Sequence, residues 1–196
     1  FTDETWQQYN LIHFDSRHTQ AAVTLAQKAS AAGVLLTIDM EKIRPHIEEL
    51  LPYCHVIFTN QNFPASASPT VTDPVQQILN IFTQPWASRC KILITTLGSK
   101  GSLIAFKQKD LEDIAHKRIT QKCCGFVDAD VWQELEVKVA QFTGINTECN
   151  SVCEDYTVIR TSACRMEKGE VVDTTGAGDA FIGAFLTAFV HGWKLE

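Results

Sequence analysis

The sequence predicts an α/β fold, a doubly wound and mostly parallel sheet with helices on both faces. Short apolar runs alternate with stretches of helical periodicity, the order strand, helix, strand that a parallel sheet with helical crossovers requires. The 196 residues are 45% hydrophobic, enough for one substantial core, and no internal repeat or long linker divides them. We therefore expect residues 1–196 to form a single domain.

The first predicted strand is the short apolar run Leu11 to Phe14. It is followed by a helix over Gln20 to Ala32, in which alanine and leucine recur at helical spacing before Gly33 ends it. Val34 to Ile38 is nearly continuous in apolar residues and predicts a buried strand. A second helix is expected around Glu41 to Leu51.

A proline and an acid mark the start of the next helix. Asp73 is a predicted N-cap, and the helix Pro74 to Phe82 has proline at its first position, where no N–H is needed. The turn Thr96 to Gly101 has a glycine at each bend and joins two strands. The apolar runs that predict the remaining strands are Val56 to Thr59, Lys91 to Thr95 and Leu103 to Phe106.

The region at about 107–170 has the weakest pattern, and we interpret it as a surface insertion, although Val131 to Phe142 has helical spacing. The chain has seven cysteines, an odd number without a secretory signal, which indicates reduced thiols. A zinc site that includes His116 is the alternative, but no Cys-x-x-Cys pair is present. The cysteines of this region are Cys123, Cys124, Cys149, Cys153 and Cys164.

The balance of charge excludes some classes of partner. The formal net charge is -6 without a run of Lys or Arg, which does not suit nucleic acid or an anionic membrane. No apolar run reaches the roughly 20 residues that span a bilayer, and Phe1 to Asn10 is unlike a signal peptide. We expect a cytoplasmic protein that binds a small molecule, with an organellar location left open because Phe1 is not an initiator methionine.

The most informative motif is a glycine-rich turn at Asp173 to Phe181, Asp-Thr-Thr-Gly-Ala-Gly-Asp-Ala-Phe, which leads into an apolar stretch. Gly176 and Gly178 allow backbone angles that point successive amides into one concavity, and a helix that starts there adds the positive end of its dipole. Asp179, in the first turn of that helix, is placed to accept a proton from a hydroxyl that attacks phosphorus. The turn therefore predicts phosphoryl transfer to an alcohol.

A simpler interpretation is a tight strand-to-helix turn with a helix-favouring acid in its first turn. Two other phosphate motifs do not fit, because a Rossmann fingerprint needs a third glycine where Phe181 stands, and the turn at Gly98 lacks the spacing of a P-loop. Polar residues also follow each predicted strand, where the ligands of doubly wound sheets collect. These residues are Asp15, Ser16, Arg17, Asp39, Asn60, Thr96 and Gly98.

The pattern Asp-Thr-x-Gly-Ala-Gly-Asp resembles the second signature of the PfkB, or ribokinase-like, family of carbohydrate and nucleoside kinases, and the resemblance extends along most of the chain. It implies a ribokinase-like fold. It also implies that Asp179 is the catalytic base. The amides that it assigns to an anion hole for the transferred phosphoryl group are those of Gly176, Ala177, Gly178 and Asp179.

The resemblance assigns further residues to ligands. Arg17, in His13-Phe-Asp-Ser-Arg17, looks like a phosphate-binding arginine of the ketohexokinase-like branch, and an ordinary surface arginine is the alternative. Many relatives carry Asn-x-x-Glu near magnesium and the phosphates, whereas Asn60-Gln-Asn-Phe63 has phenylalanine in place of the acid. The remaining assignments are Asn60 at the phosphates, Thr96, Gly98 and Gly101 beside the nucleotide, and Asp173 and Thr175 at a monovalent-cation site, with potassium as the candidate.

The resemblance implies an ATP-dependent carbohydrate kinase of the ketohexokinase and fructokinase type, a phosphotransferase with an alcohol acceptor. Magnesium is expected to travel with ATP, held by water and phosphate. The expected partners are a sugar and ATP, and a homodimer is left open. A nucleoside kinase of the adenosine type and a kinase-like scaffold that binds a partner protein are the alternatives. The family's N-terminal Gly-Gly sugar signature, lid and last helices have no match, so the chain resembles a family member truncated at both ends.

Overall fold

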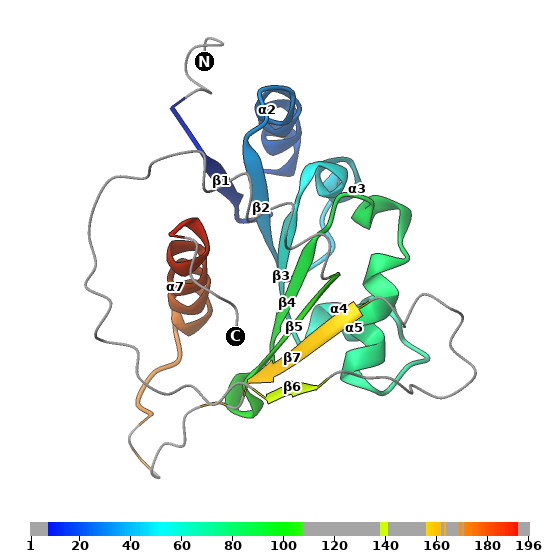
Figure 1. Ribbon diagram of the computed structural model, residues 1–196, viewed down its shortest axis with the longest axis vertical. Coiled ribbons are helices and arrows are strands. Elements are labelled where there is room, and N and C mark those ends of the chain that lie inside the picture. The colour runs from blue at the N-terminus through cyan, green and yellow to red at the C-terminus, as the bar shows by residue number, and fades with distance from the viewer. Residues whose placement is uncertain are drawn as a thin grey trace.

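The computed structural model describes residues 8–107, 138–140, 156–161, 163, 169 and 171–191. Its centre is a seven-stranded sheet in the order β1-β2-β3-β4-β5-β7-β6 (Figure 1). The first four strands pair in parallel, and β5, β7 and β6 continue the sheet in antiparallel pairs. The strands are β1 (Leu11–Phe14), β2 (Leu35–Met40), β3 (Val56–Asn60), β4 (Ile92–Thr96), β5 (Ser102–Lys107), β6 (Lys138–Ala140) and β7 (Tyr156–Thr161).

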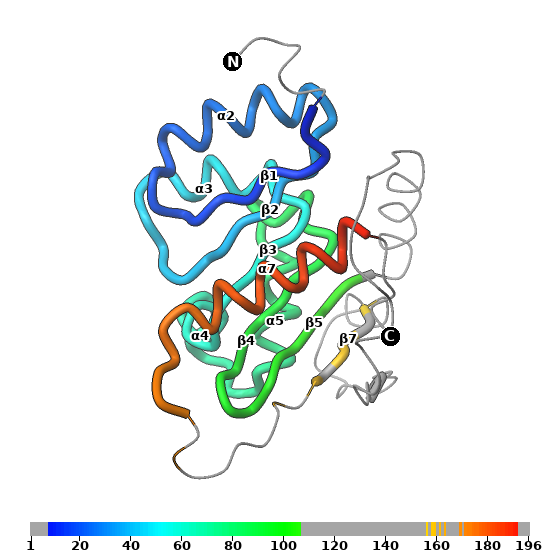
Figure 2. Tube along the Cα trace, turned by 90° about the vertical axis from the view of Figure 1, so that its left-hand side faces the viewer, coloured from blue at the N-terminus to red at the C-terminus, as the bar shows by residue number. Residues whose placement is uncertain are grey.

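Helices cover both faces of this sheet. The first face packs against α2 (Thr19–Ala31), α3 (Ile47–Leu50), α4 (Asn62–Ala67) and α5 (Pro74–Phe82), and Pro85–Ala87 and Leu51–Tyr53 form short 3-10 turns there. The second face is crossed by α7 (Ala177–Val190), as Figure 2 shows. The expected α/β architecture with helices on both faces is therefore confirmed.

The sheet separates two apolar clusters. Successive strand residues point to opposite faces, so Ile57 contributes to the cluster under α2 to α5, and Phe58 to the cluster under α7. Burial on both faces explains why these strands read as continuous apolar runs. From α7, Ile182 and Phe189 are buried against the sheet, because residues seven apart lie on one face of a helix.

Local signals in the sequence locate some elements well. β1 and α5 have the predicted bounds, and Asp73 caps α5 by accepting the amide of Gln76 at 3.1 Å. The helix expected around Glu41 to Leu51 is wrong in its first half. Pro45 disfavours a helical conformation for the residue before it, and His46 is left-handed at φ 63°, so α3 begins only at Ile47.

The interpretation of about 107–170 as a surface insertion is wrong for its described strands. Tyr156–Thr161 is β7, paired along its length with β5, and its Val158 and Ile159 are buried. The helical spacing of Val131 to Phe142 is also misleading, since Lys138–Ala140 pairs with β7 as β6. The two strands form by pairing with segments that are distant in the sequence, and the local pattern of apolar residues carries no signal of such pairing.

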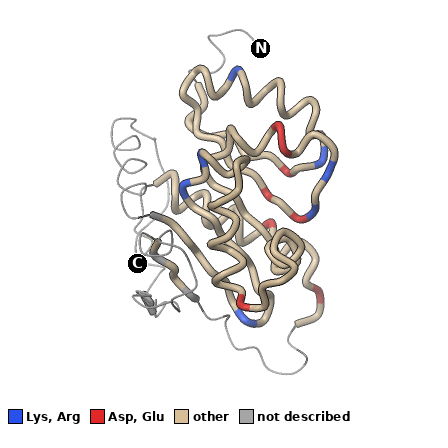
Figure 3. Tube along the Cα trace, turned by 90° about the vertical axis from the view of Figure 1, so that its right-hand side faces the viewer, with Lys and Arg blue, Asp and Glu red and all other residues tan. Residues whose placement is uncertain are grey.

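Figure 3 shows basic and acidic residues interspersed over the described chain, without a continuous basic band. This distribution agrees with the formal net charge of -6. Among the residues that the structure describes, no helix combines the length and apolar character needed to cross a membrane.

Candidate functional site

The glycine-rich turn forms the start of α7. Gly176 is the residue before the helix and is left-handed at φ 76°, a conformation that favours glycine. Residues 171–180 are all exposed, and Asp179 lies in the first helical turn. α7 runs opposite to the parallel strands in Figure 1, so the turn lies at the edge where β1 to β4 end. This is the edge at which ligands of parallel sheets bind.

The amides of the turn divide into two groups. The amide of Ala177 donates to the carbonyl of Thr174 at 3.1 Å, so it is unavailable to an anion, and its predicted place in the anion hole is wrong. Within the described part of the chain, the amides of Gly176, Gly178 and Asp179 donate to no acceptor. A Cβ added at either glycine would meet nothing within 4 Å, so the backbone there is open to a ligand. Three of the four predicted donors are therefore free at the positive end of a helix.

Asp173 shapes the turn that precedes these amides. Its Oδ1 accepts the amide of Thr175 at 2.9 Å and the Thr175 hydroxyl at 2.8 Å. The backbone hydrogen bond from Thr175, followed by that from its hydroxyl, lowers the pKa of Asp173 below its ordinary value. The carboxylate is fully charged at neutral pH, as a cation ligand must be, but one of its oxygens is already engaged. The monovalent-cation site at Asp173 and Thr175 stays a prediction.

Side chains near the ends of β1 and β2 interact electrostatically with Asp179. Nδ1 of His13 hydrogen-bonds Oγ1 of Thr37 at 2.8 Å, and the ring packs edge-on against Phe58 with centroids 5.9 Å apart. The ring of Phe58 in turn packs against the ring of Phe185 in α7, with centroids 5.4 Å apart. Burial of the His13 imidazole removes water from it and lowers its pKa, although the negative charges of Asp15 and Asp179 oppose the shift. His13 is therefore neutral at pH 7 and lies within electrostatic reach of Asp179.

Asp39 is the second ionisable group on this face of the sheet. It lies opposite Phe58 in the β2–β3 register, two residues after Thr37 and hence on the same face. Burial, with smaller contributions from Glu41, Asp179 and Asp15, raises the pKa of Asp39 to about 6. Carboxylates from the turn after β1, from β2 and from α7 thus interact electrostatically in one region.

We predict that Asp39→Asn stabilises the fold at alkaline pH. Because the folded-state pKa is raised above the unfolded value, the ionised carboxylate opposes folding fully above pH 6, and this penalty disappears as the pH falls toward 4. The substitution should therefore increase the free energy of unfolding by about 1–3 kcal/mol at pH 8 and have little effect near pH 4. Urea unfolding across this pH range measures the difference, and a gain that is independent of pH would contradict the assigned cause.

Arg17 belongs to a tight turn after β1. Its amide donates to Asp15 Oδ1 at 2.9 Å, its Nε lies 3.7 Å from Asp15 Oδ2, and Ser16 between them is left-handed at φ 60°. The hydroxyl of Thr19 donates to the carbonyl of Pro45 at 2.6 Å and ties this turn to the loop after β2. The side chain of Arg17 is 70% exposed, so its ion pair with Asp15 is weak and leaves it free to meet an anion. Its phosphate-binding role stays a prediction.

The residues after β3 have a structural role that the sequence did not reveal. Oδ1 of Asn60 accepts the amides of Asn62 and Phe63 at 3.0 and 3.3 Å, the first two residues of α4, a helix that was not predicted. Phe63 is buried and packs against Trp86 with ring centroids 6.2 Å apart. The residue that replaces the family's acid is therefore a core residue. The predicted ligand role of Asn60 would have to use its side-chain nitrogen.

The turn after β4 has the predicted glycine geometry. Gly98 and Gly101 have φ values of 59° and 94°, and the amide of Leu97 donates to the carbonyl of Gly101 at 2.7 Å. The hydroxyl of Thr96 makes a long contact of 3.5 Å with the carbonyl of Thr59. The turn lies at the same sheet edge as α7's first residues, and the roles of Thr96, Gly98 and Gly101 beside a nucleotide stay predictions.

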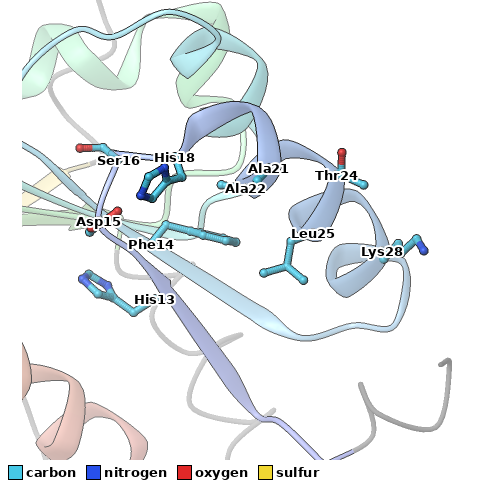
Figure 4. A pocket seen from close by; sticks show the side chains of 10 residues that line it. All are labelled: His13, Phe14, Asp15, Ser16, His18, Ala21, Ala22, Thr24, Leu25 and Lys28. Carbon is cyan, nitrogen blue, oxygen red and sulfur yellow. The ribbon is translucent and has the colours of Figure 1, made fainter. Parts of the chain in front are cut away.

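A cavity of about 540 Å³ lies between the end of β1 and α2 (Figure 4). Phe14, Ala22 and Leu25 form its apolar wall, and His18 and Lys28 add polar groups. In Figure 4, His13 and Phe14 project from opposite sides of β1, with Phe14 toward α2. The residues that line the cavity come from β1, from the turn after it and from α2, and they include His13 and Asp15 from the region around Asp179.

The described residues contain no cluster of three or more His, Cys, Asp or Glu side chains that could hold a metal. Cys54 and Cys90 are buried cysteines whose thiols hydrogen-bond to backbone carbonyls, and burial raises the pKa of Cys54 to about 12. They are packing residues. The cysteines of the alternative zinc site, Cys123, Cys124, Cys149, Cys153 and Cys164, and its His116 lie outside the described residues.

Comparison with known proteins adds to this geometry. Residues 152–196 match the model of the pfkB family carbohydrate kinases. A 45-residue stretch is 47% identical to Adenosine kinase 1 of Arabidopsis thaliana and covers 23% of this chain and 13% of that protein. Adenosine kinase of Schizophyllum commune is 23% identical over 197 residues, which cover 94% of this chain and 44% of that protein.

The fold is that of the ribokinases. The structure of Arabidopsis thaliana ribokinase complexed with ribose and ATP superimposes with a TM-score of 0.60 at 21% identity, covering 98% of this chain and 46% of that one. The chain spans less than half the length of these relatives.

Proposed function

We propose that this chain, whose residues 152–196 match the model of the pfkB family carbohydrate kinases, is a member of that family and transfers a phosphoryl group from ATP to a sugar hydroxyl. The observation that carries the proposal is the turn at the start of α7. It presents the free amides of Gly176, Gly178 and Asp179 and, beside them, an exposed carboxylate without a hydrogen-bond partner in the described residues. Donors for an anion and an acceptor for a proton are the two components that this chemistry needs.

The residues would divide the reaction between them. Asp179 takes the proton from the attacking hydroxyl as its oxygen forms a bond to the γ-phosphorus, and the bond from that phosphorus to the bridging oxygen breaks to release ADP. The amides of Gly176 and Gly178 stabilise negative charge on the transferred group, and they do so without reorganisation because the turn holds them in place. ATP supplies the phosphoryl group when it is bound.

Other residues near this edge of the sheet would bind the phosphates, the nucleotide and the cations. In this proposal Arg17, whose side chain is 70% exposed after β1, contacts phosphate oxygens, and the turn Thr96 to Gly101 borders the nucleotide. Magnesium would arrive with ATP and need few protein ligands, which suits an edge without a three-residue metal cluster in the described residues. Potassium at Asp173 and Thr175, a homodimer and a cytoplasmic location are further parts of the proposal.

The acceptor is best sought among ketohexoses, since the segment His13 to Arg17 resembles the ketohexokinase-like branch. A nucleoside is the second candidate, favoured by the 47% identity with Adenosine kinase 1 over 45 residues. The test is ADP formation by the protein that contains this sequence, with magnesium and ATP and with fructose, ribose or adenosine as acceptor. Stimulation by fructose supports the first candidate, and stimulation by adenosine alone supports the second.

The same assay separates an enzyme from a scaffold. Acceptor-dependent ADP formation that is lost in Asp179→Asn supports the proposal. Tight ATP binding with no stimulation by any acceptor would indicate a protein that keeps the fold for binding only, and would overturn the proposed activity.

A further inference from the structure

We propose that Thr19 is a positioning residue for Arg17, because its hydroxyl ties the turn after β1 to the loop after β2 and so fixes the backbone from which the arginine reaches a phosphate. The inference rests on the proposed function, in which Arg17 contacts the phosphates of ATP. It deepens that function by adding a residue that preorganises the phosphate-binding turn.

The hydrogen bond of Thr19 attaches the start of α2 to a neighbouring loop. Thr19 is the first residue of the helix, and its hydroxyl donates to the carbonyl of Pro45 at 2.6 Å. Only 7% of Thr19 is exposed, so little water competes for this contact. The start of α2 has no side-chain cap and no acid in its first turn. The contact with Pro45 therefore does what local capping does not, and holds this end of the helix in place.

Two strained residues flank this hydrogen bond. Within the described part of the chain, Ser16 and His46 are the non-glycine residues with positive φ, at 60° and 63°. Ser16 lies three residues before Thr19, and His46 directly follows Pro45. This conformation is uncommon for residues with a side chain, and it persists where the surrounding structure holds it. The hydrogen bond joins the two turns and so helps to hold both conformations.

The backbone of Arg17 is held more firmly than its side chain. The side chain is 70% exposed, and its ion pair with Asp15, at 3.7 Å, is weakened by water. The amide of Arg17 donates to Asp15 Oδ1 at 2.9 Å, and Thr19 is anchored two residues later. Figure 4 shows Asp15, Ser16 and His18 in this turn between β1 and α2. A fixed backbone reduces the entropy that is lost when the guanidinium binds an anion.

Three substitutions of Thr19 test whether its hydroxyl matters for binding. Thr19→Val removes the hydroxyl and keeps the shape, whereas Thr19→Ser keeps the hydroxyl. The dissociation constant of magnesium-ATP should rise about three- to tenfold with valine and less than about twofold with serine, because only valine releases the turn. Thr19→Ala leaves space for a water at the Pro45 carbonyl, should behave like valine, and serves where valine prevents folding. Calorimetric titration of the protein that contains this sequence measures these constants, and an affinity unchanged with valine or alanine overturns the proposal.

The Arg17→Gln background separates a positioning role from a merely structural one. Arg17→Gln should itself weaken ATP binding, and adding Thr19→Val should then cause no further loss, since the side chain to be positioned is absent. Equal losses in both backgrounds would mean that Thr19 acts independently of Arg17, and would overturn the proposal. Thr83→Val is the matched control, because the Thr83 hydroxyl also donates to a carbonyl, that of Asn80 at 2.7 Å, but at the end of α5. It should leave the affinity for ATP unchanged.

The inference and the proposed function can fail separately. ATP binding that depends on Thr19 only when Arg17 is present, in a protein without acceptor-dependent ADP formation, would support the inference and count against the proposed function. Acceptor-dependent ADP formation together with ATP binding that is indifferent to the Thr19 hydroxyl would support the function and overturn the inference.

Discussion

Replacing Asp179 by asparagine is expected to lower kcat by about two to four orders of magnitude, while the affinity for ATP stays the same or rises slightly. Asparagine has the same shape but cannot accept the proton of an attacking hydroxyl. The amides of Gly176 and Gly178 remain in place, so stabilisation of the phosphoryl group persists. The measurements are steady-state ADP formation and the dissociation constant of ATP.

The outcome distinguishes a base from a binding residue. Loss of a negative charge near the phosphates cannot weaken their binding by electrostatics, so a large rise in the dissociation constant would indicate that the turn had been distorted. Undiminished kcat would show that Asp179 is not the base. Asp73→Asn is the matched control, since Asp73 is an aspartate at the start of a helix and lies away from the turn.

The parts of the fold that were predicted well depend on local chemistry. β1 is a short apolar run, and the bounds of α5 follow from a capping aspartate and a proline that sit side by side in the sequence. α4 was missed because Asn60, which accepts the amides at its start, is the last residue of the preceding strand, and because Pro64 lies within the helix. β7 was missed because its partner β5 lies about fifty residues earlier along the chain, and pairing over such a distance leaves little local signal.

The candidate site also has one part that the sequence predicted and another part that it did not. The glycines and Asp179 form a contiguous motif, and the structure places three of the four predicted amides free at the start of α7. The hydrogen bond between His13 and Thr37 could not be predicted, since the register of β1 and β2 creates it. The sequence signal was the presence of polar residues within two mainly apolar strands, His13 in β1 and Thr37 and Asp39 in β2. A polar residue inside a buried strand indicates that a partner exists without identifying it.

Gly101→Ala is expected to destabilise the chain by about 3 kcal/mol or more, the largest effect on stability that the structure predicts. Gly101 has φ 94° and ψ -136°, a region that only glycine adopts without strain. A Cβ there would also lie 1.8 Å from the carbonyl oxygen of Thr161, the last residue of β7. Relief requires the backbone of β7 to move away from β5, where Val158 and Ile159 are buried.

Gly98→Ala is the matched control because it lies in the same turn. Gly98 is also left-handed, at φ 59°, but a Cβ there meets nothing within 4 Å, so the cost should be only about 1 kcal/mol. Urea unfolding of both variants measures the difference, which combines the collision with Thr161 and the greater backbone strain at Gly101. Equal losses would mean that β7 does not approach this turn, and that the segment which contains it lies apart from the sheet, as its weak sequence pattern had led us to expect.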